Sequence, residues 1–152
     1  MKRMVSALVA LLLLLPSLLI NTVAADNLSE TDMIYLENGS YIRVEIFSTD
    51  LRETGRKIGH KNYTYYNGEG EEKWSATLTG SFTYTGTSAT CTSSSCSVAL
   101  SDSHWSLVSK TTEKSGNTAT ATVIMENKLL GIVVDNAEVN IKLTCDGKGN
   151  LS

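Results

Sequence analysis

The stretch KWSATLTGSFTYT, residues 73–85, decides the fold of this chain. In it, apolar residues and one glycine alternate without a break with lysine, serine and threonine. A β-strand places successive side chains on opposite faces, and a helix does not produce a strict period of two. Gly80 predicts a bend, or a large neighbour that fills its space. The stretch therefore predicts a long strand with one buried face, formed by Trp74, Ala76, Leu78, Gly80, Phe82 and Tyr84.

The same period recurs on both sides of this strand. Residues 118–125 and 139–145 alternate clearly, and residues 41–47 and 57–66 are rich in aromatic and β-branched residues. Turn signals lie between these segments, at Asn38-Gly39, residues 67–70, residues 115–117 and Asp135-Asn136. Roughly eight strands at this spacing predict an all-β fold, an antiparallel β-sandwich or a small barrel.

Two segments are less regular. Residues 28–36 carry the one signal for a helix beyond the first 25 residues, and that helix would be short. Residues 84–97 are crowded with serine and threonine, a composition that also fits a flexible linker. Because Ala89 and Cys91 continue the alternation, we expect a strand that ends in a loop.

Residues 1–25 have the three parts of a secretory signal peptide: basic residues at the start, an apolar segment, and the small-residue end NTVAA. The unbroken apolar run, residues 7–15, is shorter than the ~20 residues that span a bilayer. We expect cleavage after Ala25 and export of residues 26–152 as a single β-domain. A retained membrane anchor is the alternative.

Loss of the two basic residues of the leader changes the formal net charge from −3 to −5. No run of like charge indicates a nucleic-acid partner. No second apolar stretch reaches spanning length, so we expect no membrane association after cleavage. The expected location is extracellular, with the product either released or held at the cell wall by non-covalent contacts.

Several phrases together resemble one group of proteins. They are YTY at residues 63–65, WSATLTGSFTY at 74–84, ATCT at 89–92, SGNTATA at 115–121, and LTC at 143–145 followed by GNLS at 149–152. The chain resembles an uncharacterised family of small secreted proteins from Gram-positive gut anaerobes of the clostridial kind. The resemblance covers about residues 38–152. It implies a bacterial exported origin and one intact domain, and it supplies no catalytic residues.

Three cysteines lie in the exported part, where disulfides form: Cys91, Cys96 and Cys145. An odd number permits at most one bridge within the chain. Cys91 and Cys145 lie on inward faces of alternating strands, and a bridge between them would destabilise the unfolded chain by about 4 kcal/mol. We expect that pairing, with Cys91–Cys96, Cys96–Cys145 and free thiols as alternatives. Cys96, expected in a loop, is then a tolerated thiol or the link of a covalent dimer.

No motif predicts an enzyme. Asp102-Ser103-His104 brings together the residue types of a catalytic triad, but a triad needs the base between the other two groups in space. A turn explains these residues directly. A nucleophile pair of Cys96 with His60 or His104 has no sequence feature that would lower the thiol pKa.

Acidic and metal-binding patterns are equally weak. Glu69, Glu71 and Glu72 lie at a glycine-rich hairpin tip, where solvated acids are more expected than the paired carboxylates of a glycosidase. DGKGN at residues 146–150 lacks the further carboxylates of a calcium loop. No cysteine or histidine spacing fits zinc. We expect no metal and no cofactor.

Aromatic residues give the one binding hypothesis. Tyr65 and Tyr66 are consecutive on a strand, so one of them faces away from the core. Tyr63, Tyr41 and Trp105 are candidates to join it in a surface that stacks on sugar rings or binds a protein. The alternative is that Trp74 and Trp105 are core residues and the outward tyrosine is ordinary surface.

These observations favour a non-enzymatic secreted domain that acts by surface contact with a cell-wall polymer, a glycan or an extracellular protein. A second hypothesis is a bacteriocin-like or toxin-like effector. A hydrolase with a dispersed site is a third, less favoured reading.

Overall fold

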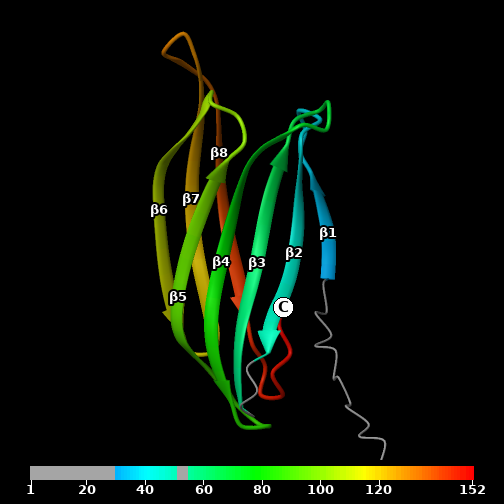
Figure 1. The fold of residues 1–152 in the computed structure, drawn as a ribbon, viewed down its shortest axis with the longest axis vertical. Coiled ribbons are helices and arrows are strands. Elements are labelled where there is room, and N and C mark those ends of the chain that lie inside the picture. The colour runs from blue at the N-terminus through cyan, green and yellow to red at the C-terminus, as the bar shows by residue number, and fades with distance from the viewer. Residues whose placement is uncertain (1–29, 51–54) are drawn as a thin grey trace, which may run out of the picture.

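The computed structural model describes residues 30–50 and 55–152, and within these ranges every regular element is a strand. The strands form two antiparallel sheets, ordered β1-β2-β3-β4-β5 and β6-β7-β8. Figure 1 shows them as two layers of a sandwich. The predicted all-β fold is confirmed, and the predicted leader, residues 1–25, lies outside the described residues. The strands are β1 (Glu30–Tyr35), β2 (Tyr41–Asp50), β3 (Arg56–Tyr66), β4 (Glu72–Tyr84), β5 (Ala89–Leu100), β6 (Trp105–Ser115), β7 (Thr118–Leu129) and β8 (Ile132–Thr144).

The central strand β4 has the two faces that its sequence predicts. Its apolar face lies against β7 and β8 of the second sheet, and Trp74, Ala76 and Leu78 are fully buried there. A Cβ atom on Gly80 would lie 2.7 Å from the Phe82 ring, so the large neighbour that fills the space of Gly80 is Phe82. The other face of β4 is a row of serine and threonine side chains, and the β4–β5 hairpin carries no lysine or arginine after Lys73.

The second sheet supplies the other half of the core. β7 and β8 alternate buried and partly exposed residues as predicted. Their buried side chains pack against β3, β4 and β5, which removes apolar surface from water and is the main source of stability. These side chains are Ala119, Ala121, Val123 and Met125 of β7 and Val139, Ile141 and Leu143 of β8.

Three predicted turns are confirmed. Asn38-Gly39 joins β1 to β2, with the Gly39 amide donating to the Leu36 carbonyl over 3.1 Å. Residues 67–70 join β3 to β4, and residues 116–117 join β6 to β7. In each turn a glycine adopts the positive φ that other residues avoid.

The predicted short helix and the predicted turn before the last strand are both wrong. From Glu30 onward the segment expected to be a short helix is strand β1, because each of its residues pairs in register with β2. Asp135 and Asn136 lie inside β8 rather than in a turn. The chain turns instead at Leu130-Gly131, where both residues have positive φ, 53° and 80°.

The serine-rich segment is also more regular than expected. Residues 85–88 form the turn, and β5 then runs through the whole cluster to Leu100. Cys96 therefore lies in the strand, opposite Leu78 of β4, and the prediction of a loop there is wrong. This segment is a strand because its backbone pairs with β4, and not because it has a buried face: many of its side chains on both faces are exposed.

All three cysteines are free thiols in the structure, so the predicted Cys91–Cys145 bridge is not formed in it. Each of these two thiols makes a local hydrogen bond instead. Cys91 Sγ donates to the Ser93 carbonyl over 3.3 Å, and Cys145 Sγ donates to the Asp146 carbonyl over 3.5 Å. Burial raises the pKa of both thiols, which keeps them protonated and slow to react.

Candidate functional site

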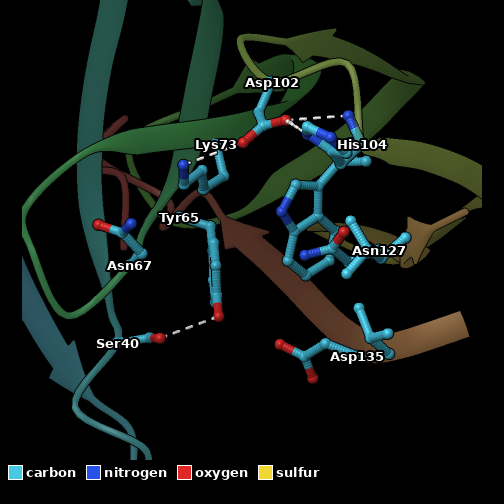
Figure 2. A pocket seen from close by; sticks show the side chains of 11 residues that line it. Ser40, Tyr65, Asn67, Lys73, Asp102, His104, Asn127 and Asp135 are labelled. Atoms are coloured by element: carbon cyan, nitrogen blue, oxygen red, sulfur yellow. Dashed lines mark hydrogen bonds and ion pairs between the residues drawn. The ribbon is translucent and has the colours of Figure 1, made fainter.

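A pocket of about 370 Å³ lies at the end of the sandwich where β3 ends and β4 begins. This volume falls in the range of small-molecule sites. Both sheets contribute to the pocket, and Figure 2 shows its polar side chains around the central aromatic groups. The lining residues are Ser40, Tyr65, Asn67, Lys73, Asp102, His104, Trp105, Asn127, Leu129, Val134 and Asp135.

One wall of the pocket is a charged cluster built on the turn between β5 and β6. The Lys73 carbonyl accepts hydrogen bonds from the backbone amides of Ser101 and Asp102, which ties this turn to the start of β4. The Asp102 carboxylate accepts from Lys73 Nζ over 2.9 Å and from His104 Nδ1 over 2.8 Å. The Lys73 and Asp102 side chains are only 17% and 21% exposed, so the cluster is held in a fixed position.

The hydrogen bonds of this cluster favour the charged forms of Asp102 and Lys73. The backbone amide of His104, followed by Lys73 and the His104 ring, holds the pKa of Asp102 far below its usual range. Hydrogen bonds to Asp102 and Glu71 raise the pKa of Lys73. A carboxylate and an ammonium therefore face the pocket together at neutral pH.

Because the pKa of Asp102 is low in the folded protein, we expect the stability of the domain to depend on pH. A carboxylate whose pKa is lower in the folded state contributes stability above its unfolded pKa of about 3.9 and loses it as the pH falls further. We expect Asp102→Asn to lower the free energy of unfolding by on the order of 1 kcal/mol at pH 7. Urea unfolding of both proteins should show that this difference shrinks below about pH 4. A difference that stays constant down to pH 3 would contradict the proposed role of the charge.

The floor of the pocket is aromatic, and it corrects part of the binding hypothesis. Tyr65 and Trp105 were candidates for an exposed surface, but they are only 3% and 4% exposed. Tyr65 stacks on Trp74 with an interplanar angle of 3°, and both rings contact Trp105 at tilted angles. The Tyr65 hydroxyl donates to Ser40 Oγ over 3.0 Å. Both residues are core side chains that also contribute to the pocket lining.

The wall opposite the charged cluster comes from the second sheet. Asn127 ends the regular part of β7 at a register shift, and Asp135 pairs with it from β8. The Asp135 carboxylate accepts from the Asn136 backbone amide over 2.8 Å. Among the described residues no side chain is hydrogen-bonded to either of these two groups. An amide and a carboxylate thus face the pocket with spare hydrogen-bonding capacity.

The outward tyrosine that the sequence predicts is Tyr66, and it belongs to a second surface. Tyr66 stacks on Tyr41 at 4.9 Å between ring centroids, and Tyr41 contacts Tyr35 at 6.0 Å. We call Tyr35, Tyr41 and Tyr66 the tyrosine row. The Arg43 guanidinium lies 5.5 Å from the centre of the Tyr66 ring. Tyr63 lies on the opposite face of the sheet, packed against the core, so it does not join the row.

The other candidate groups have structural roles. Glu71 pairs with Lys73 over 3.0 Å at the hairpin tip. The Asp146 carboxylate accepts from the backbone amides of Lys148 and Asn150, which closes a turn. Asp102 binds His104, but Ser103 is not hydrogen-bonded to that histidine. No cluster of three or more metal-ligating side chains occurs in residues 30–50 and 55–152. Within those ranges no helix is long and apolar enough to cross a membrane.

Comparison of the chain with protein-family models, curated proteins and solved structures found no match. The resemblance to secreted clostridial-type proteins therefore stays a prediction.

Proposed function

We propose that this domain is a non-enzymatic extracellular binding protein, and that its pocket holds part of a carbohydrate. The observation that carries this proposal is the composition of the pocket. Side chains with hydroxyl, amide, carboxylate and ammonium groups surround an aromatic floor made by Tyr65 and Trp105. The polar groups suit the hydroxyl groups of a sugar, and the apolar part of the lining, which includes the exposed Leu129 and Val134, suits its C–H faces.

The arrangement of charge also favours a hydroxyl-rich ligand without negative charge, because the Asp135 carboxylate has no ion-pair partner among the described residues. Lys73 and Asp102 neutralise each other on one wall, while Asp135 and Asn127 face them from the other sheet. Donors and acceptors are therefore both available to alternating hydroxyl groups. Export of the domain, a prediction from residues 1–25, would bring this pocket to cell-wall polymers and host glycans.

Retention on insoluble peptidoglycan and on a glycan array tests the proposal. The test variant is Asn127→Ala combined with Asp135→Ala, because neither side chain is hydrogen-bonded to another side chain among the described residues. We expect this variant to fold normally and to lose at least about tenfold in affinity, since each lost hydrogen bond costs about 1 kcal/mol.

Tyr35→Ala is the matched control, because it removes the most exposed ring of the tyrosine row and leaves the pocket intact. Loss of retention in this variant alone would place the ligand on the tyrosine row and overturn the pocket assignment. No retention of the unmodified protein on any glycan would overturn the function itself. Growth inhibition of neighbouring bacteria by the purified protein would then favour the effector hypothesis.

A further inference from the structure

The hairpin between β7 and β8 ends in an apolar tip that is not packed into the core. The apolar tip consists of Leu129, Leu130, Ile132, Val133 and Val134 around Gly131, and none of these aliphatic side chains is buried. Leu130 is 96% exposed and Ile132 is 68% exposed. In Figure 1 the β7–β8 turn projects beyond the neighbouring turns at the same end of the molecule.

The backbone conformation of the turn also makes a leucine at position 130 unexpected. Leu130 has φ 53°, and it is the only described residue other than glycine with a positive φ. That conformation is uncommon for a leucine, whereas asparagine adopts it readily in two-residue hairpins. The leucine is therefore unfavourable for both the backbone and the exposed surface. Contiguous exposed apolar residues of this kind mark an interaction site.

We propose that the apolar tip inserts into the surface of a lipid bilayer. The tip is convex and short, whereas a stable protein interface buries about 800 Å² on each partner. Its side chains are all aliphatic, while protein interfaces are enriched in aromatic residues and arginine. No charged residue occurs from 129 to 134. Insertion of the tip alone removes its aliphatic surface from water, without a complementary groove.

Polar residues lie at the base of the tip, as insertion of the tip into a bilayer requires. Lys128 pairs with Glu126 on β7, just before the apolar residues begin. A lysine at this position can keep its ammonium among lipid headgroups while its methylenes follow the tip. Asp135 follows Val134 on the other strand and forms the matching polar boundary. The polar limits of the tip therefore lie at similar positions on both strands, where Asp135 pairs with Asn127.

The inference replaces the expectation, drawn from the lack of a second spanning segment, that the exported domain avoids membranes. A surface-inserting hairpin needs no such segment. Leu129 and Val134 of the tip also line the sugar pocket, but Leu130 and Ile132 do not, so a change at Leu130 tests the tip without altering the pocket.

Co-sedimentation with vesicles tests the inference on the whole domain. The probes are vesicles of phosphatidylcholine and vesicles of phosphatidylcholine mixed with phosphatidylglycerol. We expect binding to both, and a decrease in affinity of about tenfold or more for Leu130→Asn. Since Asn-Gly is a preferred two-residue turn, the same variant should unfold at an equal or higher temperature. Lower affinity together with retained stability separates membrane insertion from a folding defect.

Met33→Thr is the control, because Met33 is an exposed apolar residue on β1, away from the tip. Its binding should equal that of the unmodified protein. Equal vesicle binding by Leu130→Asn, or no binding of the unmodified protein to either vesicle, would overturn the inference. Self-association that Leu130→Asn abolishes, without vesicle binding, would overturn it in favour of a second copy of the chain. Failure of glycan binding alone would leave this result unaffected.

Discussion

Trp74→Ala is expected to lower the free energy of unfolding by about 3–5 kcal/mol, the cost of truncating a large aromatic residue in a core. Trp74 is fully buried, stacks on Tyr65 at 5.3 Å between centroids and contacts Trp105 at 6.2 Å. Its removal leaves a cavity between the two sheets that these rings cannot close without leaving their packed positions. Since domains of this size are stable by only about 5–15 kcal/mol, the variant should be partly unfolded at 37 °C.

Urea unfolding followed by circular dichroism measures this effect. Ser75→Ala is the matched control, because Ser75 follows Trp74 on β4 and faces the opposite side of the sheet. Trp74→Phe should cost much less than alanine, since it keeps a ring and removes an indole N–H that is buried without a hydrogen-bond partner. A loss below 1 kcal/mol for Trp74→Ala would contradict the two-sheet core.

Gly147→Ala should be the most damaging exchange of a glycine for alanine. A Cβ atom there would lie 2.4 Å from the carbonyl carbon of Thr87 and 2.6 Å from the amide nitrogen of Ser88. Both are backbone atoms, so the two loops must move apart. That movement also breaks the hydrogen bond from the Gly86 amide to the Gly147 carbonyl, 2.7 Å long. We expect a loss of about 2–3 kcal/mol, as for other overpacked sites.

Gly68→Ala provides the comparison. A Cβ atom on Gly68 would have its nearest neighbour at 3.6 Å, an ordinary contact, so the change should alter stability by less than about 0.5 kcal/mol. Thermal unfolding of both variants side by side checks the contrast. Equal melting temperatures for the two would show that the loops at residues 85–88 and 146–150 are not packed as described.

The strands that the sequence predicts best are those with one buried face. In β4, every second residue from Trp74 to Phe82 is buried, so these positions are apolar or glycine and alternate in the sequence with polar residues. β5 lacks this constraint because many side chains on both of its faces are exposed, and its register depends on β4. The β7–β8 turn escaped prediction because Leu130 occupies a position where turn preferences favour asparagine.

The pocket was less predictable than the fold. The sequence indicated that one of two consecutive tyrosines faces outward, and Tyr66 does. The Lys73–Asp102 pair joins residues 29 positions apart, and the Asn127–Asp135 wall depends on the register of another sheet. Such groups meet only once both sheets are assembled. The one local signal was Asp102-Ser103-His104, a turn that the structure confirms and that places its acid beside Lys73.

After Lys73 the β4–β5 hairpin has no lysine or arginine, and this affects how disulfide bonds can be assigned from tryptic peptides. Trypsin cleaves after Lys73 and next after Lys110, so Cys91 and Cys96 remain together on one peptide, residues 74–110. Cys145 is released separately on residues 143–148. After oxidation, a linked pair of these peptides identifies a bridge to Cys145, whereas a Cys91–Cys96 bridge stays inside the longer peptide. A protease that cleaves between residues 91 and 96 is then needed to assign the partner.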